Sequence, residues 1–237
     1  MGQFSDQVAV VTGAAGNLGR ALCEALMAQG GRVAMLDVDA NRLSEARQGL
    51  SANGEAETFP VDLLSADDVS RVAAAVRGQF GRVDILANVA GGFAMGSPLH
   101  ETDDDTWNRM LDLNLRSVFH CCRAFTPMLL EQGGGSIINV SARAALSAKG
   151  LMGAYCASKA GVVALTESLA QELKDDGIRV NCILPGTVDT PENRASMPDQ
   201  DHERWVPTDA LADVMVFLAS PAARCVTGAA VPVYGRS

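Results

Sequence analysis

A tyrosine and a lysine four residues apart, Tyr155 and Lys159, have the side-chain types of an acid–base pair. The surrounding pattern predicts a helix over Tyr155–Leu173, and residues four apart lie on the same helical face. A fixed positive charge beside a phenol favours tyrosinate and should lower the tyrosine pKa toward the working pH. An ordinary amphipathic helix can carry the same spacing, so the rest of the chain must supply a site around the pair.

A glycine-rich stretch near the start of the chain could supply part of that site. It follows the apolar run Val8–Val11 and precedes a predicted helix over Arg20–Gln29. Strand, glycine turn and helix in this order are typical of dinucleotide binding, because the backbone can approach a pyrophosphate and the helix N-terminus offers amide donors. The candidate cofactor residues of this turn are Gly13, Gly16, Asn17, Leu18 and Gly19.

The next predicted strand, Arg32–Leu36, ends at Asp37. A carboxylate at this distance from the glycine turn is placed to accept hydrogen bonds from the adenosine ribose hydroxyls, and it would repel a 2′-phosphate. No Arg or Lys lies inside the turn or directly after Asp37, so the sequence favours NAD(H) over NADP(H). Asp39 is interpreted as a cap for a helix over Asn41–Leu50.

Other candidates follow later predicted strands. Asp62 and Leu63 could meet the adenine, although Asp62 could equally be a cap or loop residue. Asn114 lies inside a long predicted helix, Thr106–Leu130, where a buried polar role would explain an otherwise unfavourable residue. The remaining candidates for the cofactor are Asn88, Ala90, Gly91, Pro185, Gly186, Val188 and Thr190, and an apolar loop with Phe93 and Met95 could meet substrate or simply pack.

Strands and helices alternate along the whole chain. This alternation predicts an α/β fold, a single-domain Rossmann-type doubly wound parallel sheet with helices on both faces and ligands at the carboxyl ends of the strands. We expect one domain over residues 1–237, with a cofactor half over about 1–150 and a catalytic and substrate half over about 151–237. The polar stretch at about 191–207 is interpreted as a short lid.

Composition narrows the classes of partner. The formal net charge is -9 and the sequence pI is about 4.8, without a basic cluster, which argues against nucleic acid and anionic membranes as partners. The six cysteines and three histidines have no metal-binding spacing. Reduced thiols and the lack of a signal or membrane-spanning pattern favour a cytoplasmic protein.

Taken together, these motifs resemble the short-chain dehydrogenase/reductase family over nearly the full length. The family's glycine motif matches at Thr12, Gly13 and Gly19, with Asn17 in place of its middle glycine. Its other motifs match at Asn88–Gly91, Asn114, Tyr155, Lys159, Pro185 and Gly186. The resemblance implies that Thr190 meets the nicotinamide carboxamide, that Lys159 binds the nicotinamide ribose, and that Asn114 holds a water linking Lys159 to solvent. It also implies a homodimer or homotetramer.

One family position departs from the pattern. The serine usually found thirteen residues before the tyrosine is Ala142 here. Ser141, one residue earlier on a strand, should point to the opposite face, although a bulge could bring it or Ser147 into the site. The segments around Ala142 and Tyr155, and the lid with Met197 and Trp205, are similar to the dihydropteridine-reductase-like branch of the family, which also lacks this serine.

The resemblance implies hydride transfer between nicotinamide and a small-molecule substrate, with Tyr155 exchanging the proton. The substrate would be a carbonyl, an alcohol or an activated C=N compound such as a quinonoid dihydropterin. A 3-oxoacyl thioester or another ketone is the alternative, and a non-catalytic dinucleotide-binding sensor is a second one. The candidate substrate contacts are Phe93, Met95, Ser141, Met197 and Trp205.

Overall fold

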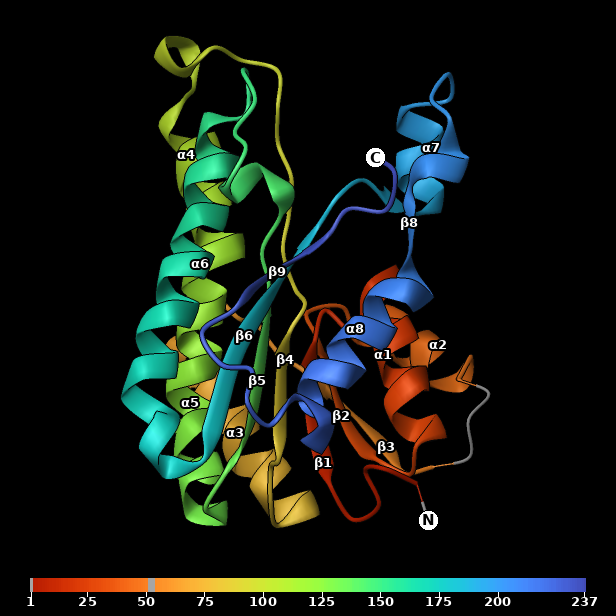
Figure 1. Cartoon of the computed structure of the whole chain (residues 1–237), viewed down its shortest axis with the longest axis vertical. Coiled ribbons are helices and arrows are strands. Elements are labelled where there is room, and N and C mark those ends of the chain that lie inside the picture. Colours follow the sequence, from red (N-terminus) through yellow and green to blue (C-terminus); the bar gives the residue numbers. More distant parts are fainter. Residues whose placement is uncertain (1, 51–53) are drawn as a thin grey trace.

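A single seven-stranded parallel sheet forms the centre of the computed structural model, which describes residues 2–50 and 54–237 (Figure 1). The strand order is β3-β2-β1-β4-β5-β6-β9, so the direction of winding reverses between β1 and β4. The carboxyl ends of the strands at such a reversal open into a crevice for a ligand. The strands are β1 (Val8–Thr12), β2 (Arg32–Asp37), β3 (Ala56–Pro60), β4 (Ile85–Asn88), β5 (Gly135–Val140), β6 (Ile178–Pro185) and β9 (Ala230–Val233).

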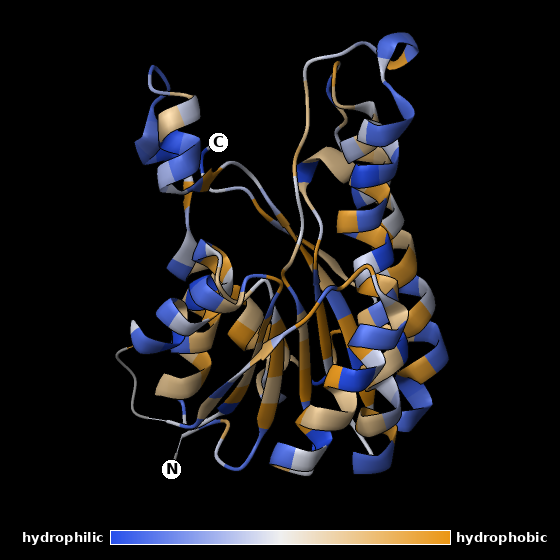
Figure 2. Cartoon of the chain, turned by 180° about the vertical axis from the view of Figure 1, so that it is seen from behind, coloured by the Kyte–Doolittle hydropathy of each residue, from blue (hydrophilic) through white to orange (hydrophobic). Residues whose placement is uncertain are grey.

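Helices cover both faces of the sheet, as predicted (Figure 1). One core contains buried side chains of α1 (Asn17–Ala28), α2 (Ala40–Gln48) and α8 (Thr208–Ala219). The other contains side chains of α3 (Ala66–Phe80), α5 (Ser117–Gln132) and α6 (Gly153–Leu173). The inner strands, from β2 to β6 in the sheet order, are apolar along most of their length (Figure 2), as expected of strands that are covered by helices on both faces.

The predicted helix over Thr106–Leu130 is not one regular helix. It consists of α4 (Asp104–Leu111), a π-helical turn η2 (Asp112–Arg116) and α5. The extra residue of a π-helical turn shifts the helix face, and such turns are frequent at functional sites. Here the turn carries Asn114, the mid-helix polar residue that the sequence singled out.

The predicted lid, about 191–207, is an ordered flap above the carboxyl ends of the strands (Figure 1). It contains α7 (Pro191–Ser196) and a 3₁₀ turn η5 (His202–Arg204), and its two ends are joined by pairing of β7 (Val188–Asp189) with β8 (Val206–Pro207). Thr190 caps α7 by accepting a hydrogen bond from Asn193 N. The other 3₁₀ turns are η1 (Leu99–Glu101), η3 (Arg143–Ala145), η4 (Lys174–Asp176) and η6 (Pro221–Ala223).

None of the helices within residues 2–50 and 54–237 combines the length and the apolar character needed to cross a bilayer.

Candidate active site

A pocket of about 640 Å³ opens at the carboxyl ends of β1 to β4, where the winding of the sheet reverses. Most of the predicted cofactor residues lie in its walls, as expected of a dinucleotide site at a switch point. The lining includes Gly13, Gly16, Asn17, Leu18, Gly19, Asp37, Asp62, Leu63, Ala90, Gly91, Val188 and Thr190.

The glycines at this pocket are required by close backbone contacts. Gly13 has a φ of +65°, and a Cβ there would lie 2.9 Å from Ala90 N. A Cβ on Gly19 would overlap the backbone oxygen of Gly13. Thr12 joins the two turns, because its Oγ1 accepts hydrogen bonds from Val89 N at 3.0 Å and Ala90 N at 3.1 Å. The turns after β1 and β4 therefore form one tight cradle with exposed backbone, which fits a pyrophosphate-bearing cofactor.

Asp37 is held at the end of β2 by backbone amides. Its Oδ2 accepts from Ala15 N at 3.1 Å and its Oδ1 from Val38 N at 2.8 Å. Oδ1 also accepts a longer bond from Asp39 N at 3.4 Å, whereas Oδ2 keeps a further lone pair for a ribose hydroxyl. Arg42, from the first turn of α2, also lines this pocket, and sequence reasoning missed it. The sequence did contain an indication of this position. Asp39 caps a helix that begins just after Asp37, so Arg42, in the first turn of that helix, follows Asp37 by only five residues.

Tyr155 and Lys159 share one side of α6, but they do not share a hydrogen bond. The Lys159 ammonium is buried, lies 6.0 Å from the Tyr155 ring centre and donates to the Val140 backbone oxygen at 2.9 Å. Burial lowers the pKa of Lys159 to about 8 and raises the pKa of Tyr155 to about 12. The predicted lowering of the tyrosine pKa is therefore wrong for the protein alone, because loss of solvation outweighs the charge of Lys159.

Asn114 connects the acid–base pair to the cofactor cradle. It is fully buried, and its Oδ1 accepts from Gly92 N at 2.9 Å while its Nδ2 donates to Gly92 O at 3.1 Å. A Cβ on Gly91 would lie 2.7 Å from Asn114 Oδ1 and 3.2 Å from Lys159 Nζ. Gly91 is thus the point at which the cradle and the pair meet.

Ser158 is a further residue of this network that sequence reasoning missed. Its Oγ accepts from Asn114 Nδ2 at 3.1 Å and donates to the Tyr155 backbone oxygen at 2.8 Å. The sequence indicated this role only through the position of Ser158, which directly precedes Lys159 and lies on the buried side of α6. Ser158 fixes the π-helical turn against the start of α6.

Neither of the two hydroxyls that the sequence suggested, Ser141 and Ser147, takes the place of the missing serine. Ala142 is 7% exposed and extended. Ser141 is buried and its Oγ donates to the Lys159 backbone oxygen at 2.7 Å, so the prediction that Ser141 contacts substrate is wrong. Ser147 is exposed beyond η3. Phe93 packs edge-on against Tyr155, with ring centres 4.9 Å apart, and gives the pair an apolar neighbour.

Comparison with known proteins identifies the family. A model of the short chain dehydrogenases matches residues 7–201. The chain belongs to this family. It is 37% identical to D-threitol dehydrogenase from Mycolicibacterium smegmatis, across 98% of this chain and 93% of that one, and 35% identical to 2-(R)-hydroxypropyl-CoM dehydrogenase from Xanthobacter autotrophicus, across 97% of each. Carveol dehydrogenase from Mycobacterium avium in complex with NAD superimposes with a TM-score of 0.92 at 28% identity, covering 99% of this chain and 98% of that one.

Several residues of this short chain dehydrogenase that were predicted to contact the cofactor or the substrate lie outside the pocket lining. Asn88 is buried and donates to Asn139 Oδ1 at 2.8 Å, so its side chain braces β4 against β5. Trp205 is 7% exposed and packs on His202, with ring centres 4.4 Å apart, which makes it part of the flap's own core. Pro185 and Gly186 lie beneath the end of the chain, where Gly186 N donates to Val233 O. Met95 and Met197 are exposed.

Within the part of the chain that the structure describes, no group of three or more His, Cys, Asp or Glu side chains could hold a metal ion. The six cysteines are free, and burial raises the pKa of Cys122 to about 12.

Proposed function

We propose that the chain is an NAD(H)-dependent oxidoreductase that interconverts a secondary alcohol and a ketone. The observation that carries this proposal is the meeting of cradle and acid–base pair at Gly91, beside both Asn114 and Lys159. The relatives named for threitol and for a hydroxypropyl compound act on alcohols, which supports this substrate class. Asp37 supports NAD over NADP, since its carboxylate would face the adenosine ribose.

The residues of the cradle fit the cofactor by the contacts described above. The glycine turn would hold the pyrophosphate, Asp37 the ribose hydroxyls and Thr190 the nicotinamide end. The chemistry that bound NAD⁺ supplies is acceptance of a hydride from the alcohol carbon, which leaves a ketone, NADH and one proton. Every other task falls to side chains of this chain.

Tyr155 would manage the proton at its hydroxyl oxygen. Its raised pKa, about 12, keeps it protonated at neutral pH, so it is ready to donate to a ketone oxygen during reduction. In oxidation it must take the alcohol proton, which requires that the pKa fall once a positive charge lies closer. Lys159, which is largely protonated at neutral pH because its pKa is about 8, would supply that charge and bind the nicotinamide ribose.

A quinonoid dihydropterin is the second candidate, favoured by one observation. Ala142 offers no hydroxyl beside the pair, and Ser141 is committed to Lys159 O. A ketone or alcohol loses one orienting hydrogen bond at this position, worth roughly 0.5–1.5 kcal/mol. A compound already activated for hydride addition tolerates that loss better.

The test is a turnover panel followed at the NADH absorbance. The substrates are secondary alcohols with NAD⁺, and small ketones, 3-oxoacyl thioesters and quinonoid dihydropterin with NADH. Turnover of alcohols and ketones supports the first candidate, and turnover of dihydropterin alone replaces it with the second. If NADH binds but no member of the panel reacts, a dinucleotide-binding sensor is the better description.

We also propose a homodimer or homotetramer. Phe119 and Leu130 on α5 are 44% and 41% exposed, and large apolar side chains on one helix suit an interface. Light scattering during size-exclusion chromatography measures the mass, and a monomer of 24.8 kDa would reject the proposal.

A further inference from the structure

The end of the chain is folded back over the turn that follows β6. After β9, the segment Tyr234–Ser237, which we call the C-terminal tail, crosses the turn that follows β6. Thr187 N donates to Ser237 Oγ at 3.1 Å, and a Cβ on Gly186 would lie 2.8 Å from Tyr234 O. The turn under the tail is the one whose proline and glycine match the family's nicotinamide-binding motif, so the tail borders the proposed reacting end of the site.

The C-terminal tail gathers arginines from three separate segments. The Arg143 guanidinium lies 5.0 Å from the Tyr234 ring centre and donates to Ser237 O at 2.6 Å. Arg236 N donates to Arg204 O at 3.1 Å, and the Arg236 guanidinium donates to a flap backbone oxygen at 2.9 Å. η3, the flap and the tail therefore each bring one arginine to this part of the molecule, and we call these three residues the arginine rim: Arg143, Arg204 and Arg236.

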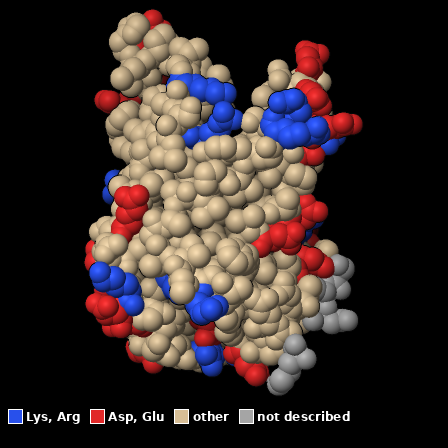
Figure 3. Space-filling model, in the orientation of Figure 1, with Lys and Arg blue, Asp and Glu red and all other residues tan. Residues whose placement is uncertain are grey.

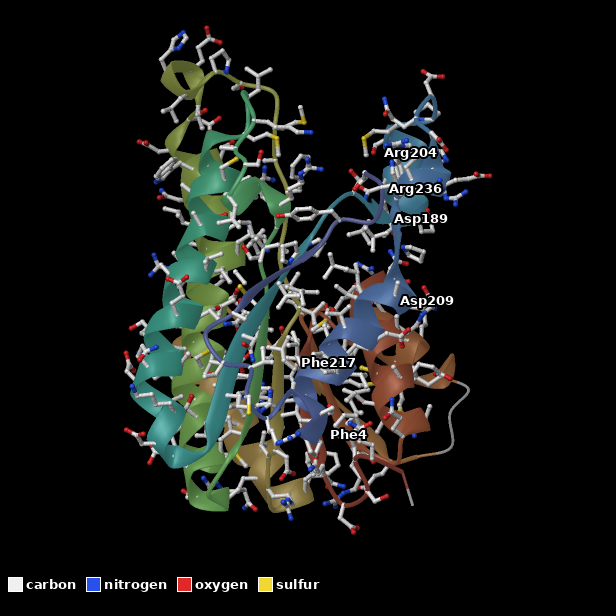
Figure 4. All side chains as sticks on the ribbon, viewed as in Figure 1. Phe4, Asp189, Arg204, Asp209, Phe217 and Arg236 are labelled. Atoms are coloured by element: carbon white, nitrogen blue, oxygen red, sulfur yellow. The ribbon has the colours of Figure 1, made fainter. Side chains whose placement is uncertain are left out.

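The arginine rim borders a hollow. Figure 3 shows Lys and Arg side chains on both sides of the hollow between the two upper projections of the molecule. Figure 4 shows Arg204 and Arg236 close together on the projection that carries α7. The flap also carries the acids Asp199, Asp201 and Glu203, and the formal net charge of the chain is -9, so direct contacts with the guanidiniums, rather than a long-range field, would hold an anion at the rim.

The acidic side chains of the described residues do not pair with the rim, and Arg143 is bonded instead to Ser237 O at 2.6 Å, a contact that an incoming oxyanion would replace. Among the side chains of residues 2–50 and 54–237, no ion pair of 4.0 Å or less joins Arg143, Arg204 or Arg236 to an acid. The nearby carboxylate of Asp189 is bound by Arg194 through bonds of 2.5 and 2.7 Å. Exposed guanidiniums with unused N–H groups match an oxyanion, which they can bind with paired hydrogen bonds.

The chain geometry also sets the distance from the rim to the reacting groups. Lys159 Nζ bonds to Val140 O, and Arg143 is three residues further along the chain, at the start of η3 after the extended Ala142. Three residues span at most about 10 Å. The backbone of Arg143 therefore lies within about 10 Å of the strand end to which Lys159 is bonded. The rim is also separate from the glycine cradle, because none of its arginines lines the cofactor pocket.

We infer that the arginine rim binds a carboxylate-type oxyanion on the substrate, several bonds from its reacting alcohol or ketone carbon, with Arg143 and Arg236 as the main contacts. This inference rests on the proposed function and specifies its substrate class. The substrate is then a hydroxy acid or oxo acid rather than a neutral polyol or a simple ketone.

The test uses matched pairs of compounds on the intact enzyme. Secondary hydroxy acids with the carboxylate two to five carbons from the alcohol carbon are each compared with their methyl esters, which lack the charge. We expect kcat/KM for the best acid to exceed that of its ester by about 10- to 100-fold, the size of a lost charge-assisted contact. Raising the ionic strength should reduce kcat/KM for the acid and leave the ester unchanged.

Variants then locate the contact. Arg143→Gln and Arg236→Gln should each lower kcat/KM for the acid by about tenfold or more and leave the ester within twofold. Arg143→Lys keeps the charge without the paired donors and should lie between Gln and wild type. Arg224→Gln, which changes an exposed arginine at the end of η6, is the control and should alter neither compound. Thermal unfolding confirms that each variant is folded.

A binding measurement separates this inference from the proposed function. Calorimetric titration of the NADH-bound enzyme with saturated carboxylates, and with their methyl esters, needs no turnover. Tighter binding of the carboxylate, abolished in Arg143→Gln, supports the rim even if no alcohol in the panel reacts. Equal binding of acid and ester, or binding unaffected in both variants, overturns the inference, whereas turnover of neutral alcohols would leave the proposed function standing.

Discussion

Lys159 Nζ lies 6.0 Å from the centre of the Tyr155 ring and is bonded at 2.9 Å to the backbone oxygen of Val140. The lysine is thus anchored to the end of β5, and the tyrosine projects beside it from the same helix. This arrangement explains why burial, rather than mutual attraction, determines both pKa values in the protein alone.

Removing the Tyr155 hydroxyl should abolish most of the chemistry without weakening cofactor binding. We expect Tyr155→Phe to lower kcat by about 10²- to 10⁴-fold, the usual contribution of a positioned proton donor. The dissociation constant for NADH, measured by fluorescence titration, should stay within about twofold. Ser168→Ala, on the exposed side of the same helix, is the control. Retention of full turnover by the phenylalanine variant would remove Tyr155 from the mechanism.

Buried Lys159 should make stability depend on pH in a defined direction. Its pKa is lowered from 10.5 to about 8 on folding, so between these values the unfolded chain binds more protons and stability rises with pH. The free energy of unfolding of wild type, minus that of Lys159→Met, should increase by about 3 kcal/mol from pH 7 to pH 10.5. Urea denaturation across this range measures it, and a difference that stays flat or falls would contradict the burial of a charged lysine.

Cofactor preference should depend on Asp37. Asp37→Ser removes the carboxylate that would repel a 2′-phosphate and leaves Arg42 in the same pocket wall. We expect the ratio of kcat/KM for NADPH to that for NADH to rise by about tenfold or more, because the NADH ribose loses a charge-assisted hydrogen bond. Asp39→Ser, which changes the cap of α2, should leave the ratio unchanged although it can alter stability. An unchanged ratio in Asp37→Ser would mean that another group selects the cofactor.

Much of this site could be predicted because its residues are tied to regular elements. The strand ends that carry Gly13, Asp37, Asp62 and Ala90 follow from alternation and apolar runs, and parallel strands bring their carboxyl ends to one edge. The π-helical turn at Asn114 could not be predicted, because it depends on the tertiary bonds to Gly92. Contacts between irregular segments, such as those of η3 with the C-terminal tail, leave no periodic signal in the sequence.

The packing of the cradle predicts a contrast between two glycines. A Cβ on Gly19 would overlap Gly13 O, so Gly19→Ala must displace α1 or the glycine turn and should weaken NADH binding by about tenfold or more. A Cβ on Gly78 in α3 would meet nothing within 4 Å, so Gly78→Ala should raise stability by up to about 1 kcal/mol, since alanine favours a helix. Calorimetric titration and urea denaturation measure the two effects. NADH binding of wild-type strength in Gly19→Ala would show that this turn does not hold the cofactor.

Restoring the missing serine tests what its absence means for the substrate. Ala142 lies directly after Ser141, whose own hydroxyl is bound to Lys159 O, so Ala142→Ser would add a new hydroxyl at the family's usual position. For a ketone or alcohol the added hydrogen bond, worth about 0.5–1.5 kcal/mol, should raise kcat/KM by roughly 2- to 10-fold. Ala145→Ser, in the 3₁₀ turn that directly follows Ala142, is the control for a hydroxyl added nearby. A substrate that is already activated for hydride addition should gain no activity from this contact. Loss of activity in Ala142→Ser, with unchanged stability, would indicate instead that the native substrate needs the apolar surface of Ala142.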